Sequence, residues 1–265
     1  SEMCIRDRHG MICVAFTPDE EIGMGAEHFN LDQFGAEYAY TLDGDSEGEI
    51  QYENFNACKA EFEIRGFNVH PGEGKDTMIN ASLVAIEINN CLPSMETPRG
   101  TEDYEGFYHL ISMQGEVGEA KLNYIVRDHD KNGFEERKKT LRLIEKNLNA
   151  KWGEGTVTLK ITDQYLNMKE IVEEHMHLID HAKKACEAAG VAPLILPIRG
   201  GTDGCQLSFK GLPCPNLGTG GHAFHGPYEH ISVEGMEKSV ELLLALIQEY
   251  TCLLYTSPSP RDAHE

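Results

Sequence analysis

The stretch FTPDEEIG, residues 16–23, places two adjacent carboxylates, Glu20 and Glu21, directly after an apolar run. That run, residues 12–16, predicts a strand, and Pro18 and Gly23 bracket the acids as in a turn. We therefore expect both acids at the carboxyl end of a strand, where ligands gather in open α/β sheets. One can bind a metal while the other acts as a general base. The alternative is a solvated helix start, because acids favour a helix N-terminus.

Three later segments add residues of similar chemistry. Asp43 follows an apolar segment and precedes a glycine, Arg199 opens an Arg-Gly-Gly loop, and His225 ends the stretch GGHAFH. An acid pair, a lone acid after a strand, an Arg-Gly-Gly loop and a late His-Gly, in this order, resemble the co-catalytic zinc exopeptidases. The resemblance extends from about His9 to Thr251 and is closest to the tripeptide aminopeptidases. Four further blocks carry it: ENFNA at 53–57, NVHPG at 68–72, YEGFYHL at 104–110 and GLPCPNL at 211–217.

The resemblance implies a dizinc site in which Glu20 is the general base and acid. Glu21, Asp43 and His225 would be ligands of two Zn²⁺ ions per subunit. Zinc takes imidazole and carboxylate ligands and keeps a position open for water in catalytic sites. Two zinc ions roughly 3.5–4 Å apart can share a hydroxide and polarise the scissile carbonyl.

The resemblance also implies residues that hold the substrate. His70 would stabilise the oxyanion, in the partner subunit's site, although it also fits a turn before a proline. Arg199 would pair with the substrate's carboxylate, which suits its planar fork. Arg127 is a second candidate for this task, and a surface ion pair with Asp128 or a neighbour is its alternative. Asn56 would orient substrate or form a hinge, while Thr202 and Asp203 would hold the Arg-Gly-Gly loop.

The rest of the pattern predicts two domains. The segment 55–166 follows the order β-α-β-β-α-β of a ferredoxin-like α+β domain, and the resemblance implies a lid or dimerisation domain. Residues 9–54 and 167–251 are expected to form an α/β catalytic domain, an αβα sandwich that is incomplete at its N-terminus. Predicted strands lie at 11–16, 37–42, 194–198 and 216–221, and predicted helices at 26–29, 169–189 and 233–250. His177 and His181 could clamp a metal on one helix face, but no acidic partner motif accompanies them.

Both ends of the chain are interpreted as foreign. Residues 1–8 and 252–265 resemble translated sequencing-adapter tails, which leads us to expect a gene cut at its 5′ end. Family members carry two further ligands upstream, a His in a His-x-Asp motif and a bridging acid, and neither is in this chain. We therefore expect the chain as given to bind metal weakly and to be inactive, whereas the full gene product is a peptidase.

Composition excludes several classes of partner. The net charge of the 265 residues is −21, with acids spread along the chain, which argues against nucleic acid and anionic membranes. No apolar stretch approaches the roughly 20 residues that span a bilayer. The cysteines include no Cys-x-x-Cys pair, which is typical of reduced core thiols in a cytoplasmic protein.

The expected function is zinc-dependent release of the N-terminal residue from tripeptides by a cytoplasmic homodimer that pairs through the lid. Another amidohydrolase, a dipeptidase or an aminoacylase, is the nearest alternative, because the shared motifs do not determine the substrate. A non-catalytic binding or dimerisation module is the alternative from a different class. Convergence of Glu21, Asp43 and His225 in the folded chain would distinguish the enzyme from the module.

Overall fold

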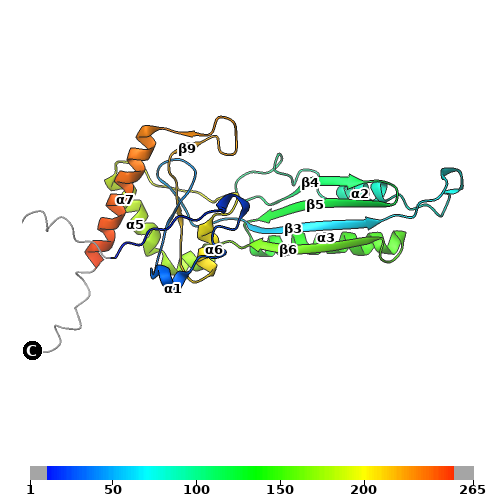
Figure 1. The fold of residues 1–265 in the computed structure, drawn as a ribbon, viewed down its shortest axis with the longest axis horizontal. Helices are drawn as coiled ribbons and strands as arrows, with labels where there is room; N and C mark the ends of the chain where they lie inside the picture. The colour runs from blue at the N-terminus through cyan, green and yellow to red at the C-terminus, as the bar shows by residue number, and fades with distance from the viewer. Residues whose placement is uncertain (1–10, 254–265) are drawn as a thin grey trace, which may run out of the picture. The chain divides into compact units, whose positions relative to one another are not determined.

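The computed structural model describes residues 11–253, and the chain divides into two compact units (Figure 1). One unit combines residues 1–54 with 168–265, and the other comprises residues 55–167. The predicted tails at 1–8 and 254–265 lie outside the described residues. The helix α7 (Val233–Leu253) includes residues 252 and 253, which had been assigned to the second tail. None of the described helices is both long and apolar enough to cross a membrane.

The unit 55–167 is built on a four-stranded antiparallel sheet with the order β4-β5-β3-β6. Two helices, α2 and α3, connect the strands in the predicted order β-α-β-β-α-β, so the ferredoxin-like arrangement is confirmed. The bounds are β3 (Asn56–Arg65), α2 (Ala81–Asn90), β4 (Phe107–Gly115), β5 (Glu119–Asp128), α3 (Lys131–Trp152) and β6 (Val157–Tyr165).

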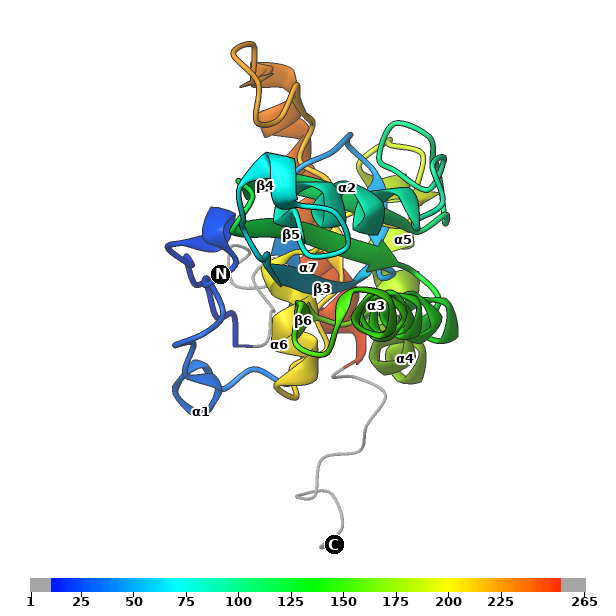
Figure 2. The same cartoon turned by 90° about the vertical axis from the view of Figure 1, so that its right-hand side faces the viewer.

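Both helices cover one face of this sheet (Figure 2). Along β3 the side chains alternate, so Phe62 and Ile64 are buried beneath the helices while Glu61 and Glu63 face away. The open face is polar, and the carboxylate of Glu63 accepts a hydrogen bond from Lys121 Nζ at 2.8 Å. The alternation predicted from the sequence is confirmed.

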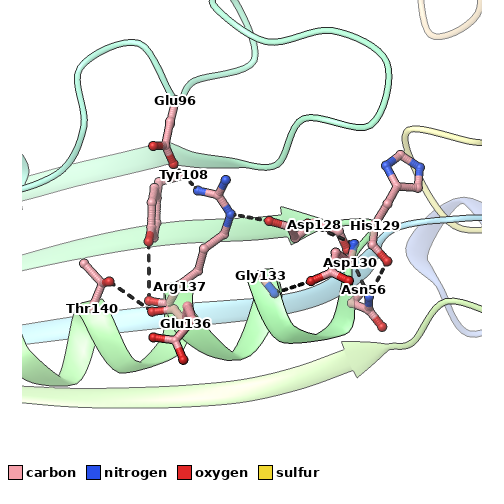
Figure 3. Close-up of polar contacts among 10 residues, drawn as sticks. All are labelled: Asn56, Glu96, Tyr108, Asp128, His129, Asp130, Gly133, Glu136, Arg137 and Thr140. Carbon is pink, nitrogen blue, oxygen red and sulfur yellow. Dashed lines mark hydrogen bonds and ion pairs between the residues drawn. The ribbon is translucent and has the colours of Figure 1, made fainter.

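A polar cluster links the start of α3 to the sheet (Figure 3). Asp130 caps the helix, because its side chain accepts a hydrogen bond from the Gly133 N–H at 2.6 Å. Arg137, one turn further along, donates from Nε to Asp128 Oδ2 at 2.7 Å and from Nη1 to Glu96. The two carboxylates satisfy a guanidinium that the helix would otherwise bury without a partner.

The other unit contains a mixed sheet of short strands in the order β1-β8-β2-β7. The pairs β1·β8 and β2·β7 are parallel, and β2·β8 is antiparallel. The bounds are β1 (Thr41–Leu42), β2 (Glu49–Gln51), β7 (Leu194–Ile195) and β8 (Asn216–Leu217). The sequence predicted the first, third and fourth at greater length, and it missed β2.

The Asn216 side chain joins three of these strands. Its Oδ1 accepts from Thr41 Oγ1 at 2.8 Å, and its Nδ2 donates to Asp43 O and to Gln51 Oε1, both at 2.7 Å. Asn216 is 1% exposed. A buried amide that uses both its carbonyl and its amino group rigidifies the strands that it contacts.

Helices complete this unit, and α5 and α7 pack against each other (Figure 1). α5 buries Leu178 and Ala182, while α7 buries Leu242 and Leu246. The bounds of the helical segments that precede α7 in this unit are the 3₁₀ turn η2 (Glu20–Ile22), α1 (Leu31–Phe34), α4 (Lys169–Val172), the 3₁₀ turn η4 (Glu173–His175), α5 (His177–Ala188) and α6 (Asp203–Phe209). With these elements the unit has the predicted α/β character.

Three sequence predictions about this unit are wrong. Residues 11–16 pair with no strand in the described part of the chain, and Phe16 is 93% exposed. An apolar run becomes a strand only when a neighbouring edge accepts its hydrogen bonds, and none of the described strands does so. The predicted helix at 26–29 is a turn, and the helix begins at Leu31, which Asn30 caps. The predicted helix at 169–189 is interrupted by η4, where His175 packs against Tyr38.

We predict that Arg137→Ala lowers the free energy of unfolding by about 3–5 kcal/mol, because Asp128 loses the ion pair that compensates its burial. Chemical denaturation followed by circular dichroism measures this. Lys139→Ala is the control, since Lys139 lies on the same helix with a side chain that is 67% exposed, and its loss should cost below about 1 kcal/mol. Equal effects of the two substitutions would contradict the assignment.

We predict that Asn216→Ala destabilises the protein by about 2–4 kcal/mol, because Thr41, the carbonyl of Asp43 and the buried Gln51 lose their hydrogen bonds to this amide. The exposed Gln33→Ala in the same unit should change stability by less than about 0.5 kcal/mol. Thermal melts of both variants test this, and unchanged stability of Asn216→Ala would show that the strands do not depend on the amide.

Candidate functional site

The two adjacent acids lie on the 3₁₀ turn η2, as the bracketing residues predicted. Asp19 precedes the turn with φ 63° and Gly23 follows it with φ 74°, both left-handed. The Gly23 N–H closes the turn on Glu20 O at 2.7 Å. A non-glycine residue with positive φ is strained, so the conformation of Asp19 is maintained by its surroundings. The predicted turn and its alternative, a helix start, are both partly correct, because the two acids lie in a tight turn that is also a short 3₁₀ helix.

Asp43 directly follows β1, where the sequence placed it. Its backbone N–H donates to Leu217 O at 3.2 Å, and its carbonyl accepts from Asn216 Nδ2 at 2.7 Å. The backbone of Asp43 is thus held on β8, while its carboxylate is partly buried. This arrangement presents a carboxylate at the end of a strand.

His225 lies at the tip of the hairpin formed by β9 (Gly221–His222) and β10 (His230–Ile231). Its φ is 58°, and that of Ala223 is 57°, so the tip carries two strained residues. Its backbone N–H donates to Glu229 Oε2 at 3.0 Å. The imidazole Nε2 lies 3.2 Å from Glu21 Oε2. Two predicted metal ligands from distant segments therefore meet.

Electrostatics links the remaining acids to this pair. Burial, with the nearby charges of Asp43, Asp203 and Glu21, raises the pKa of Glu20 to about 7, while His225 opposes the shift. Burial and the charges of Glu21 and Asp203 raise the pKa of Asp43, and His225 partly opposes this rise. The structure thus shows one direct contact, between Glu21 and His225, and the charges of both act on Glu20 and Asp43, as does the charge of Asp203.

This donor set fits cations. Three carboxylates and an imidazole are ligands that zinc accepts, and their mutual repulsion is relieved by positive charge. In residues 11–253 no three His, Cys, Asp or Glu side chains already stand in a metal-binding arrangement. Glu21 and His225 contact each other with the atoms that would face a metal. The residues that would hold it are Glu21, Asp43 and His225.

Sequence reasoning missed the position of Asp203, which it assigned only to the support of a loop. Asp203 begins α6, is 3% exposed, and raises the pKa of both Glu20 and Asp43. The only signal in the sequence is an acid after three small residues in GGTD. This pattern predicts a helix start equally well.

Arg199 belongs to the same unit as this cluster. It follows Ile198, which forms a parallel bridge with Asn54, and its side chain is half-buried. His177 and His181 lie on α5 with ring centroids 6.1 Å apart. His181 faces Glu249 of α7 at 3.5 Å, which fits the structural role expected for this pair.

The three other predicted residues lie in the unit 55–167. His70 is exposed and its Nδ1 accepts from the Gly72 N–H at 3.2 Å, which stabilises a turn. Arg127 is buried and donates to Val126 O and Gln164 Oε1 at 3.1 and 3.2 Å. Its predicted alternative, a surface ion pair with Asp128, is wrong, because Asp128 pairs with Arg137 inside the unit.

Asn56 is 2% exposed and its amide is fully engaged. Nδ2 donates to Asp128 O and His129 O, both at 3.0 Å (Figure 3). Oδ1 accepts from the Asn167 N–H, also at 3.0 Å. These bonds join the first and last residues of the unit 55–167. The placement favours a structural role for Asn56 over contact with a substrate.

Comparisons with known proteins identify relatives of this chain. The sequence model of peptidase family M20/M25/M40 matches residues 4–249 of this chain. Peptidase T of Clostridium perfringens is 56% identical over 243 residues, covering 92% of this chain and 60% of the relative. Peptidase T of Halothermothrix orenii is 54% identical over 242 residues, or 91% of this chain and 59% of the relative. The chain thus spans about 60% of the length of these relatives.

Among solved structures, aminopeptidase PepT of Bacillus cereus superposes with a TM-score of 0.76 at 24% identity, over 88% of this chain and 63% of that one. A tripeptidase of Staphylococcus aureus gives 0.79 at 18% identity, over 89% and 63%. A dinuclear metal-binding peptidase of Bacillus subtilis gives 0.65 at 16% identity, over 91% and 65%. These likenesses show the same fold, and with the match over residues 4–249 the chain belongs to peptidase family M20/M25/M40.

Proposed function

We propose that the whole protein is a dizinc aminopeptidase that releases the N-terminal residue from tripeptides. The observation that carries the proposal is the convergence of Glu20, Glu21, Asp43 and His225 from segments far apart in the chain. A non-catalytic module has no need to gather these groups against their repulsion. The names of the relatives, Peptidase T, support the substrate class.

In this proposal Glu21, Asp43 and His225 hold zinc, which when bound supplies a polarised water and a Lewis acid for the scissile carbonyl. Glu20 accepts the proton of the attacking water and passes it to the leaving amine. Arg199 pairs with the carboxylate of the substrate. His70 hydrogen-bonds to the developing oxyanion, from the partner subunit, and Arg127 is a second contact for the substrate's carboxylate.

We also assign the protein to the cytoplasm, as a homodimer that pairs through the unit 55–167. The described cysteines are thiols, and Cys58, Cys186, Cys205 and Cys214 are buried. Burial raises the pKa of Cys58 and Cys214 to about 12, which keeps these thiols protonated and unreactive. Buried thiols of this kind are typical of proteins in a reducing compartment.

We predict that catalysis depends on Glu20. The test uses the 265-residue chain alone and the chain completed with the part of the Clostridium perfringens relative that the match leaves uncovered. We expect the completed protein to hydrolyse tripeptides with Zn²⁺, and Glu20→Gln to lower kcat by about 10²–10⁴-fold, because the proton acceptor is lost. Chromatography of the released amino acid measures the rate.

Glu27→Gln is the control for this variant, since Glu27 is exposed and lies in the next turn of the chain. Cleavage of acylated amino acids in place of tripeptides would leave the site assignment and overturn the substrate class. Full activity of Glu20→Gln would remove Glu20 from the mechanism.

We predict that Zn²⁺ binding depends on His225. We expect His225→Ala to weaken Zn²⁺ binding by at least about tenfold, because a neutral imidazole ligand is lost. Competition with a chromophoric chelator measures the affinity. His222→Ala on the same hairpin is the matched control, because that ring is tilted against the His230 ring at a centroid distance of 5.4 Å, while the pair with Glu21 is made by His225. Equal losses in the two variants would attribute the effect to the hairpin.

A further inference from the structure

Asp203 is a buried carboxylate for which the described residues provide no compensating partner. It is 3% exposed, and neither Oδ1 nor Oδ2 has a hydrogen-bond donor within residues 11–253. The hydroxyl of the preceding Thr202, 7% exposed, is likewise without a partner among the described residues. Removing a carboxylate from water without a donor or a countercharge costs free energy, so the native protein needs something to offset it.

The surroundings of Asp203 are closely packed. A Cβ atom added to Gly25 would lie 2.2 Å from Oδ2 and 2.5 Å from Oδ1, so the turn after Glu20 and Glu21 presses its backbone against the carboxylate. On the other side, the thiols of Cys205 and Cys214 are near enough to be affected by its charge. Asp203 is 3% exposed, so in this arrangement its carboxylate is not accessible to a substrate.

The charge of Asp203 acts on the predicted site. It contributes to the raised pKa of both Glu20 and Asp43. Asp128 is a useful contrast, because it is also buried, at 7% exposure, but receives the Arg137 guanidinium at 2.7 Å. Asp128 thus has a protein countercharge, whereas Asp203 has neither an ion pair nor a hydrogen-bond donor within residues 11–253.

We propose that Asp203 is an outer-sphere carboxylate of the metal centre, whose negative charge is compensated by the cations that Glu21, Asp43 and His225 hold. This inference rests on the proposed function, and it assigns Asp203 a positioning role rather than catalysis. Carboxylates behind the ligands of a metal orient them and increase its retention. The glycine at position 25 lets the ligand-bearing turn come close to this carboxylate.

The test compares Asp203→Asn with Asp128→Asn in the 265-residue chain and in the completed protein. Two quantities are measured for each: the midpoint of thermal unfolding in the presence of a chelator, and the affinity for Zn²⁺ by chelator competition. Asparagine keeps the shape of aspartate, removes its charge and replaces one carboxylate oxygen with an amide nitrogen. A purely structural carboxylate and an outer-sphere carboxylate therefore differ in the sign of the first measurement.

For Asp203→Asn we expect the metal-free midpoint to rise by about 2–4 °C, since an uncompensated charge is removed. The affinity for Zn²⁺ should fall by about 10- to 100-fold. For Asp128→Asn we expect the opposite pattern, a lower midpoint and an unchanged affinity, because its countercharge is Arg137.

A lower metal-free midpoint for Asp203→Asn would show that the carboxylate has a structural partner, and would overturn the inference. An unchanged Zn²⁺ affinity would overturn it as well, while leaving the proposed function intact. Failure of the unsubstituted completed protein to bind Zn²⁺ would instead overturn the proposed function and this inference together.

Discussion

Repulsion between carboxylates is the constraint on which the arrangement of the unit that carries the site depends. Glu20, Glu21, Asp43 and Asp203 come from three separate segments; the charges of the other three raise the pKa of Glu20, and those of Glu21 and Asp203 raise the pKa of Asp43. Hydrophobic burial does not favour such a gathering, since charged groups gain nothing from leaving water. The backbone must therefore hold these residues in place, and positive charge must offset the repulsion between the carboxylates. The exposed imidazole of His225, 3.2 Å from Glu21, offsets only part of this repulsion.

The backbone holds the site through hydrogen bonds rather than through long strands. β1, β2 and β8 have two or three residues each, and the buried Asn216 amide joins all three, with one bond directly to the carbonyl of Asp43. The left-handed backbone conformations of Asp19 and His225 set the direction of the chain in the other two segments, the turn with Glu20 and Glu21 and the tip of the hairpin. Strain of this kind persists where the surrounding structure determines the conformation, which is frequent at functional sites.

The unit 55–167 shows the opposite balance. Its four strands extend over nine or ten residues, its core is apolar, and the buried Asp128 and Lys138 are paired with Arg137 and with Glu135 and Asp163, respectively. Local pattern and tertiary structure agree throughout it, which is the signature of a sequence that specifies one fold. The ferredoxin-like order could therefore be predicted from the alternation along β3 and the amphipathic spacing of α3. In the other unit the same reasoning failed at residues 11–16, because a strand needs an edge that the pattern cannot supply.

The sequence by itself determined the long periodic elements, the turn at Glu20 and Glu21, and the position of Asp43 at the end of a strand. These depend on residues close together in the chain, where side-chain period, glycine and proline act directly. The tertiary structure alone decided that Glu21 meets His225, that Arg127 is buried with neutral partners while Asp128 pairs with Arg137, and that Asp203 lies beside the acids without a partner of its own. Contacts of this kind join distant segments, and their energies depend on burial and on neighbouring charge, which no local pattern records.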